Sequence, residues 1–298
     1  FNMPLDRPPA SRVRWPEFSH VIFDCDSTLS TVEGIDVLAE GLGLSAEVAG
    51  MTDAAMAGEI DLSEIYAARL QMLQPSKRAI AELRSAYKTN IVPDAAAVIA
   101  ALQEIDIEVY VVSGGLAEPV EEFAVSLGID PDNVRAVATR HDSLSGEWWK
   151  AGQQSVDEDF AGFDSGALTR SDGKAEIITA LLDGKSGMSM LVGDGASDLS
   201  AADTVDLFVG FGGVVARDHV AAEAPAFIST KSLAPVLPMA AGPGGAERLQ
   251  SEEARALFAH GTALIQRGGA TLADEERQRR LLAALDFATQ HLETEDSG

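Results

Sequence analysis

The chain has 298 residues, 46% of them hydrophobic, and a formal net charge of −25 at pH 7. This length suits one large domain or two modest ones with a sizeable core. So negative a charge argues against binding nucleic acid or anionic membranes through a basic face, and it is typical either of adaptation to high salt or of an ordinary acidic protein.

The composition also bears on the compartment. No run of about 18 or more uncharged apolar residues is present, which argues against a transmembrane helix. The N-terminus lacks a basic stretch followed by an apolar segment, so we expect no secretory signal. The single cysteine, Cys25, excludes an intramolecular disulfide and fits a reducing compartment. We therefore expect a cytoplasmic protein that has no membrane partner.

Residues 20–29 are typical of a buried strand that ends in an acidic turn. An apolar run leads directly into Asp24 and Asp26, and Thr28 follows. In open α/β sheets, ligands bind at the carboxyl ends of the strands. Two carboxylates on one turn suit Mg²⁺, or a nucleophile paired with a general acid/base. Asp-x-Asp also occurs in ordinary turns, so this segment alone leaves both interpretations open.

Apolar spacing predicts helix throughout residues 33–74, and prolines at 75 and 93 punctuate its exit. The interval between residues 23 and 109 is too long for one crossover between parallel strands. We therefore predict an inserted helical cap over residues 33–91. The alternative is a helical layer of the core itself.

The remaining pattern alternates short apolar strands with helices. Strands are predicted at Val21–Phe23, Val109–Val112, Met190–Val192 and Leu207–Val209. Helices are predicted at Ala95–Glu104, Pro119–Leu127 and Ala175–Leu182. This alternation indicates an α/β fold with a doubly wound, Rossmann-like parallel sheet, formed by residues 3–32 and 92–237.

Two later segments add an anion nest and a cation. Ser113, Gly114 and Gly115 end the second strand, where a hydroxyl and bare backbone N–H groups suit an anion. The alternative is a plain turn into the next helix. Lys174 starts a helix and would offset the charge of a phosphate, unless it is a surface lysine.

A further acidic turn follows a later strand, in the segment 193–198. There Asp194 would ligate a metal directly, and Asp198 would hold its water shell. The alternative is a solvated turn. Acids at the ends of two strands, however, are much less expected from unrelated solvated turns than from one shared site. These parts fit phosphoryl transfer: Asp24 attacks phosphorus and forms an aspartyl-phosphate, and Asp26 acts as acid and then as base. Mg²⁺, Ser113 and Lys174 would neutralise the equatorial oxygens.

Beyond residue 237 the alternation of predicted strands and helices ends. The segment 239–245, Met-Ala-Ala-Gly-Pro-Gly-Gly, is a linker by composition. Two amphipathic helices follow, and the second is predicted to begin near Thr271, where Thr271-x-x-Asp274 resembles a capping box. This extension, residues 238–298, is expected to dock on the main body or on a second subunit as a homo-oligomer. Its role in oligomerisation, regulation or stability stays open.

The chemical motifs, taken in order, resemble those of a known superfamily. Asp24-Cys-Asp26-Ser-Thr28, Ser113-Gly-Gly, Lys174 and Gly193-Asp194-Gly-Ala-Ser-Asp198 resemble the four ordered motifs of the haloacid dehalogenase superfamily of phosphohydrolases. More narrowly, residues 19–235 resemble the phosphoserine phosphatase family. The segments that carry this likeness are Glu33–Ala39, Met51–Met56, Arg69–Ser76 and Phe208–Gly213.

The resemblance implies Mg²⁺-dependent hydrolysis of O-phospho-L-serine to L-serine and phosphate, as in serine biosynthesis. It implies that Glu33 takes the substrate ammonium, Arg69 its carboxylate and Met56 an apolar contact, while Ser113, Gly114 and Gly115 hold the phosphate. It also implies that Asp24, Asp26, Asp194 and Asp198 surround the metal. The chain departs from the family at Ala57, at Ser197 and in a longer segment at 146–160.

Other functions stay open on the sequence. The same chemistry would serve another small phosphomonoester, such as phosphohomoserine or phosphoethanolamine. A phosphotransferase would use an alcohol acceptor in place of water. From a different class, a catalytically idle binding or regulatory module would act through the C-terminal helices, although the intact acids, Ser113 and Lys174 weigh against it.

Overall fold

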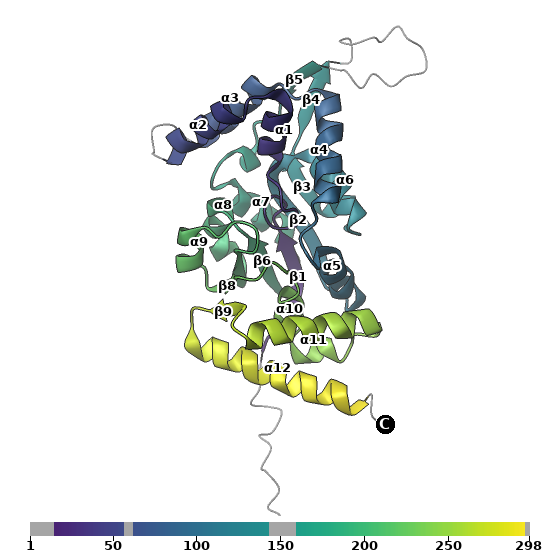
Figure 1. Cartoon of the computed structure of the whole chain (residues 1–298). Helices are drawn as coiled ribbons and strands as arrows, with labels where there is room; N and C mark the ends of the chain where they lie inside the picture. Colours follow the sequence, from purple (N-terminus) through teal and green to yellow (C-terminus); the bar gives the residue numbers. More distant parts are fainter. Residues whose placement is uncertain (1–14, 57–61, 143–158, 296–298) are drawn as a thin grey trace, which may run out of the picture.

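A computed structural model describes residues 15–56, 62–142 and 159–295 of the chain. Its centre is a seven-stranded sheet in the order β3-β2-β1-β6-β7-β8-β9 (Figure 1). All neighbouring strands pair in parallel except β8 and β9, which are antiparallel. The strands are β1 Phe18–Phe23, β2 Glu108–Leu116, β3 Val134–Val137, β6 Met188–Gly193, β7 Leu207–Phe211, β8 Ala226–Ile228 and β9 Ala270–Leu272.

Strand β1 lies between β2 and β6, and its pairing register aligns their carboxyl ends. Val21 is opposite Val109 of β2 and Met190 of β6. The four predicted strands all lie inside observed ones, which confirms them. A nearly continuous apolar run such as that of β1 is typical of a parallel strand covered on both faces. The acidic turns that follow β1 and β6 therefore meet at one edge of the sheet.

Helices cover both faces of this sheet. Val21 and Phe23 belong to a core that includes Phe123 of α6, whereas Ile22 points to the opposite face, in a core that includes Ile178 of α7. The flanking helices are α5 Ala95–Glu104, α6 Ala117–Ser126, α7 Gly173–Leu182, α8 Ala196–Ser200 and α9 Asp218–Glu223. The doubly wound α/β fold predicted from the sequence is confirmed.

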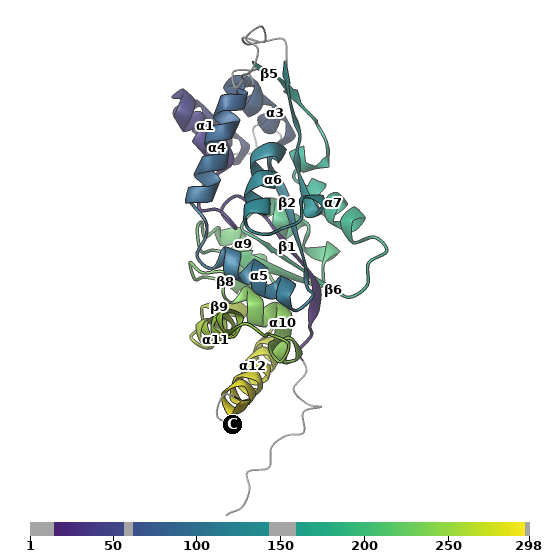
Figure 2. The same ribbon diagram turned by 90° about the vertical axis from the view of Figure 1, so that its right-hand side faces the viewer.

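The stretch between β1 and α5 forms several helices at one end of the molecule, away from the C-terminal helices (Figures 1 and 2). These helices are α1 Gly34–Leu42, α2 Ser45–Met56, α3 Leu62–Leu73 and α4 Lys77–Thr89. The helical structure predicted for residues 33–74 is confirmed over the described residues, but it is divided among several helices, because Gly43 ends α1 in a left-handed conformation with φ 72°. A two-stranded ribbon, β4 Thr139–Asp142 and β5 Asp159–Phe163, lies at the same end. Most of the long segment predicted at 146–160 lies outside the described residues.

The predicted linker at 239–245 is also wrong, because this segment lies in helix α10, Val236–Ala246. Gly242, at φ 58°, takes up a kink before Pro243, so both residues fit inside a buried helical segment. A Cβ on Gly245 would lie 3.2 Å from Ile105 at the end of α5. Glycine at this position therefore allows close packing. The segment has the composition of a flexible linker but is part of a buried helix.

Helices α11, Glu252–Gln266, and α12, Glu275–Glu295, complete a layer against the main body. Phe258 of α11 and Leu285 of α12 join the same apolar core as β1. The predicted start of the second helix near Thr271 is wrong, since Thr271 lies in the edge strand β9 and Asp274 accepts a hydrogen bond from Arg277 N at 2.9 Å. Among the residues that the structure describes, no helix has the length and apolar character needed to span a membrane.

The shared core makes a prediction for the C-terminal layer. We expect Phe258→Ala to lower the free energy of unfolding by about 3–5 kcal/mol, because it removes a fully buried ring. Urea unfolding measures this loss. Glu253→Ala on the exposed side of the same helix is the control, with a loss below about 1 kcal/mol. Equal small losses would mean that the layer contributes little to the cooperative core.

Candidate active site

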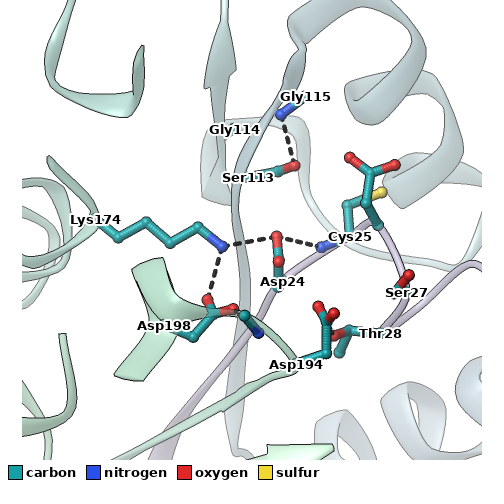
Figure 3. Close-up of polar contacts among 12 residues, drawn as sticks. Asp24, Cys25, Ser27, Thr28, Ser113, Gly114, Gly115, Lys174, Asp194 and Asp198 are labelled. Atoms are coloured by element: carbon teal, nitrogen blue, oxygen red, sulfur yellow. Dashed lines mark hydrogen bonds and ion pairs between the residues drawn. The ribbon is translucent and has the colours of Figure 1, made fainter. Parts of the chain in front are cut away.

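The turn after β1 holds Asp24 rigidly at the edge of the sheet (Figure 3). Asp24 N donates to Val192 O at 2.9 Å, which extends the pairing of β1 with β6 as far as this residue. Asp24 Oδ1 accepts from Cys25 N at 2.8 Å. Ser27, at φ 53°, closes the turn in the left-handed region. The carboxylate is therefore fixed by backbone geometry with only 8% of the residue exposed.

Lys174 is buried beside that carboxylate. Its Nζ lies 2.9 Å from Asp24 Oδ1 and 2.7 Å from Asp198 Oδ1 (Figure 3). Burial alone would lower the pKa of Lys174, but the charges of Asp198 and Asp24 outweigh it and hold the pKa above its ordinary value. The preceding Gly173 is essential to this placement, since a Cβ there would lie 1.6 Å from Ala167 O. The lysine thus brings a permanent positive charge into the site.

Asp24, Asp194 and Asp198 form the candidate metal centre. Their ligating oxygens lie within 4.8 Å of one another, and all three residues are buried. Burial and the charge of Asp24 raise the pKa of Asp194 to about 6 and that of Asp198 to about 7. Carboxylate oxygens are the ligands that Mg²⁺ prefers, and a divalent cation would relieve this repulsion. The residues present therefore fit the predicted metal.

The carboxyl of Asp26 lies apart from that cluster and is held by the helices. Asp26 Oδ1 accepts hydrogen bonds from Tyr87 Oη at 2.7 Å and from Gly34 N at 2.8 Å. Burial, followed by the charges of Glu33 and Asp24, raises the pKa of Asp26 to about 8. A pKa raised in this way favours the protonated carboxyl at neutral pH, the state that a general acid requires.

The turn that contains Ser113 lies on the side of Asp24 away from Asp194 and Asp198 (Figure 3). Ser113 is fully buried, and its Oγ accepts from Gly115 N at 2.9 Å (Figure 3). A Cβ on Gly115 would lie 3.1 Å from both Asp26 Oδ2 and Ser113 Oγ. Because Gly115 has no side chain, the space between the Ser113 hydroxyl and the Asp26 carboxyl stays open for a small anion.

A cavity of about 390 Å³ joins these groups to the helices α1, α3 and α4. Glu33 and Arg69, predicted from the sequence, both line it. Glu33 Oε1 accepts from Ser27 Oγ at 2.6 Å and from Arg217 Nη2 at 3.3 Å. Arg69 Nε is buried and has no hydrogen-bond partner among the described residues, so it is a donor available to an anion. The side chain of Met56 lies outside the described residues.

The sequence reasoning missed Arg217 and Tyr87. Arg217 Nε lies 2.9 Å from Asp194 Oδ2, and the same guanidinium reaches Glu33, so it links the candidate metal centre to the Glu33 side of the cavity. An arginine shortly after the carboxyl end of β7, in a chain with so few cations, was a usable signal. Tyr87 carried none, because its helix lies far from Asp26 in the sequence.

The raised pKa of Asp26 predicts a pH dependence of stability. The folded protein, in the presence of a chelator, keeps a proton on Asp26 that the unfolded chain loses at a pKa near 4, so Asp26 makes stability fall as pH rises from about 4 to about 8. Urea unfolding at several pH values gives the slope. Asp26→Asn is the control and should make the slope shallower, while the raised pKa values of Asp194 and Asp198 account for the slope that remains. Identical slopes for the two proteins would contradict the assignment.

Comparisons with known proteins agree with this geometry. The haloacid dehalogenase-like hydrolase family matches residues 21–203. The chain is 34% identical to phosphoserine phosphatase of Rattus norvegicus over 211 residues. This alignment covers 70% of this chain and 88% of the rat protein. It is 35% identical over 214 residues to the chloroplastic phosphoserine phosphatase of Arabidopsis thaliana, with 70% and 68% covered. A solved structure described as a phospho-aspartyl intermediate analogue of phosphoserine phosphatase is 26% identical at a TM-score of 0.55, covering 74% of this chain and 98% of that one. The chain belongs to the haloacid dehalogenase-like hydrolase family.

Proposed function

We propose that this protein is a cytoplasmic, Mg²⁺-dependent phosphatase that hydrolyses O-phospho-L-serine to L-serine and phosphate in serine biosynthesis. The observation that carries the proposal is the buried Asp24, which pairs with Lys174 and lines one small cavity together with Asp26. Glu33 and Arg69 in that cavity offer opposite charges for a zwitterionic substrate. The similarity to phosphoserine phosphatases supports the choice of substrate.

The first half-reaction transfers the phosphoryl group to Asp24. Lys174 Nζ and Cys25 N both contact Asp24 Oδ1, so we assign the attack on phosphorus to Oδ2. As the Oδ2–P bond forms, the P–O bond to serine breaks, and its electron pair stays on the serine oxygen. Asp26 gives that oxygen its proton, so serine leaves as the neutral alcohol.

In the second half-reaction, Asp26 takes a proton from water, and the water oxygen attacks the phosphorus of the aspartyl-phosphate. The bond from phosphorus to Asp24 then breaks, which restores the carboxylate and releases phosphate. Lys174, the Ser113 hydroxyl and the N–H groups of Gly114 and Gly115 stabilise the charge on the equatorial oxygens in both steps. Asp24, Asp194 and Asp198 would hold Mg²⁺, which would supply further positive charge for phosphoryl transfer.

Substrate recognition falls to the helical side of the cavity. The Glu33 carboxylate would bind the ammonium, in competition with its contacts to Ser27 and Arg217. Arg69 would bind the carboxylate, because its buried Nε lacks a partner among the described residues and a guanidinium matches a carboxylate in two parallel hydrogen bonds. The resemblance to phosphoserine phosphatases also assigns Met56 an apolar contact with the substrate. This pairing favours an amino acid phosphate over phosphoethanolamine, which has no carboxylate.

The nucleophile gives the first test of the mechanism. We expect Asp24→Asn to lower phosphoserine turnover by more than about 10³-fold while the protein stays folded, since an amide cannot form the acyl phosphate. Phosphate release measures turnover, and circular dichroism checks the fold. Asp203→Asn, at an exposed position, is the control. Turnover retained in Asp24→Asn would overturn the mechanism.

Arg69 gives the test of the substrate. We expect Arg69→Met to lower kcat/KM for phosphoserine by about 10- to 100-fold, the value of a charged hydrogen bond, and to leave phosphoethanolamine nearly unchanged. Arg170→Met is the matched control, because Arg170 also lines the cavity but pairs with Asp172 and Glu176.

Assays of the wild type with phosphoserine, phosphohomoserine and phosphoethanolamine would complete this test. A preference of the wild type for phosphoethanolamine would contradict the assigned substrate. Analysis of the products formed with added alcohols would reveal phosphotransfer. An absence of hydrolysis across the panel would favour a binding module.

A further inference from the structure

Tyr87 belongs to none of the motifs that carry the proposed chemistry, yet its hydroxyl touches Asp26. It lies in α4, which packs beside α6 (Figure 2). The side chain is fully buried, and its ring stacks on Phe123 of α6 with centroids 5.4 Å apart and an interplanar angle of 24°. A ring packed in this way holds its hydroxyl at one point, 2.7 Å from Asp26 Oδ1.

Gly34 converges on the same oxygen. Its backbone N, at the start of α1, donates to Asp26 Oδ1 at 2.8 Å. A Cβ on this residue would lie 2.4 Å from the Tyr87 hydroxyl, so the glycine is what lets the two donors share one acceptor. Both come from the helices between β1 and α5, whereas Asp24 is held by the sheet.

This convergence decides which oxygen of Asp26 is engaged as an acceptor and which is left to carry the proton that a general acid delivers. A backbone N–H only donates, so Oδ1 must accept from Gly34, and it then accepts from Tyr87 as well. The acidic proton is left to Oδ2. That oxygen faces the bare backbone of Gly115, 3.1 Å from where a Cβ would stand, beside the Ser113 hydroxyl. The proton therefore points to the side of Asp26 where the phosphate would bind.

We propose that Tyr87 is a positioning residue for the general acid: with Gly34 N, it keeps Oδ1 of Asp26 as the acceptor and directs the proton on Oδ2 toward the leaving oxygen of the substrate. This inference rests on the proposed function. It predicts that loss of the hydroxyl harms departure of a poor leaving group much more than departure of a good one, because only the poor one needs the proton.

The test is Tyr87→Phe, which keeps the ring on Phe123 and removes one oxygen. We expect kcat/KM for phosphoserine, whose serine alkoxide leaves poorly, to fall about 10- to 100-fold. We expect kcat/KM for p-nitrophenyl phosphate, whose phenolate leaves without a proton, to change less than about 3-fold. With phosphoserine, the loss should lie in kcat, and KM should stay within about 2-fold of the wild type.

Tyr66→Phe is the matched control, since that hydroxyl also lines the cavity but donates to Gly114 O at 2.9 Å. It should change both substrates by a similar factor. Equal losses on both substrates in Tyr87→Phe, a loss confined to KM, or full activity would each overturn the proposal. A wild type that fails to hydrolyse phosphoserine would instead overturn the proposed function, and thermal unfolding of both variants verifies their folding.

Discussion

The structure of the site depends on burying several carboxylates together with few cations. The carboxylate oxygens of Asp24, Asp194 and Asp198 lie close enough together to bind one metal ion, in a protein whose net charge is already −25. Such clustering is unfavourable unless the charges are paired or neutralised. Lys174 pairs with Asp24 and Asp198, and Arg217 pairs with Asp194. The remaining repulsion is what makes the cluster suited to a divalent cation.

The two groups proposed for proton and phosphoryl transfer are held by different parts of the fold. The nucleophile extends the β1–β6 pairing, so its position follows from sheet register. The acid is gripped by Tyr87 of α4 and Gly34 of α1. This division leaves Asp24 paired with a lysine, whereas burial and the charges of Glu33 and Asp24 raise the pKa of Asp26. Neighbouring acids on one turn can therefore take opposite roles.

What the sequence analysis missed at two glycine-containing segments has one physical cause. Glycine and proline at 239–245 were interpreted as a linker, but Gly242 and Gly245 are buried in α10, where small residues let helices approach closely. Likewise the periodic pattern over residues 33–74 did not locate the break at Gly43. Propensity describes how a residue behaves alone, whereas tertiary contacts decide whether a glycine bends a loop or admits a neighbour.

The sequence by itself determined the alternating α/β pattern, and the order of the motifs indicated a phosphoryl-transfer site. Asp24, Ser113, Lys174 and Asp194 follow or flank predicted strands and helices, and parallel strands align their carboxyl ends, so local pattern was enough. Only the tertiary structure decided that Tyr87 and Arg217 join this site, that Asp26 is held by Tyr87 and Gly34, and that the C-terminal helices share the core. Each of these depends on burial and on contacts between distant segments, which no local pattern contains.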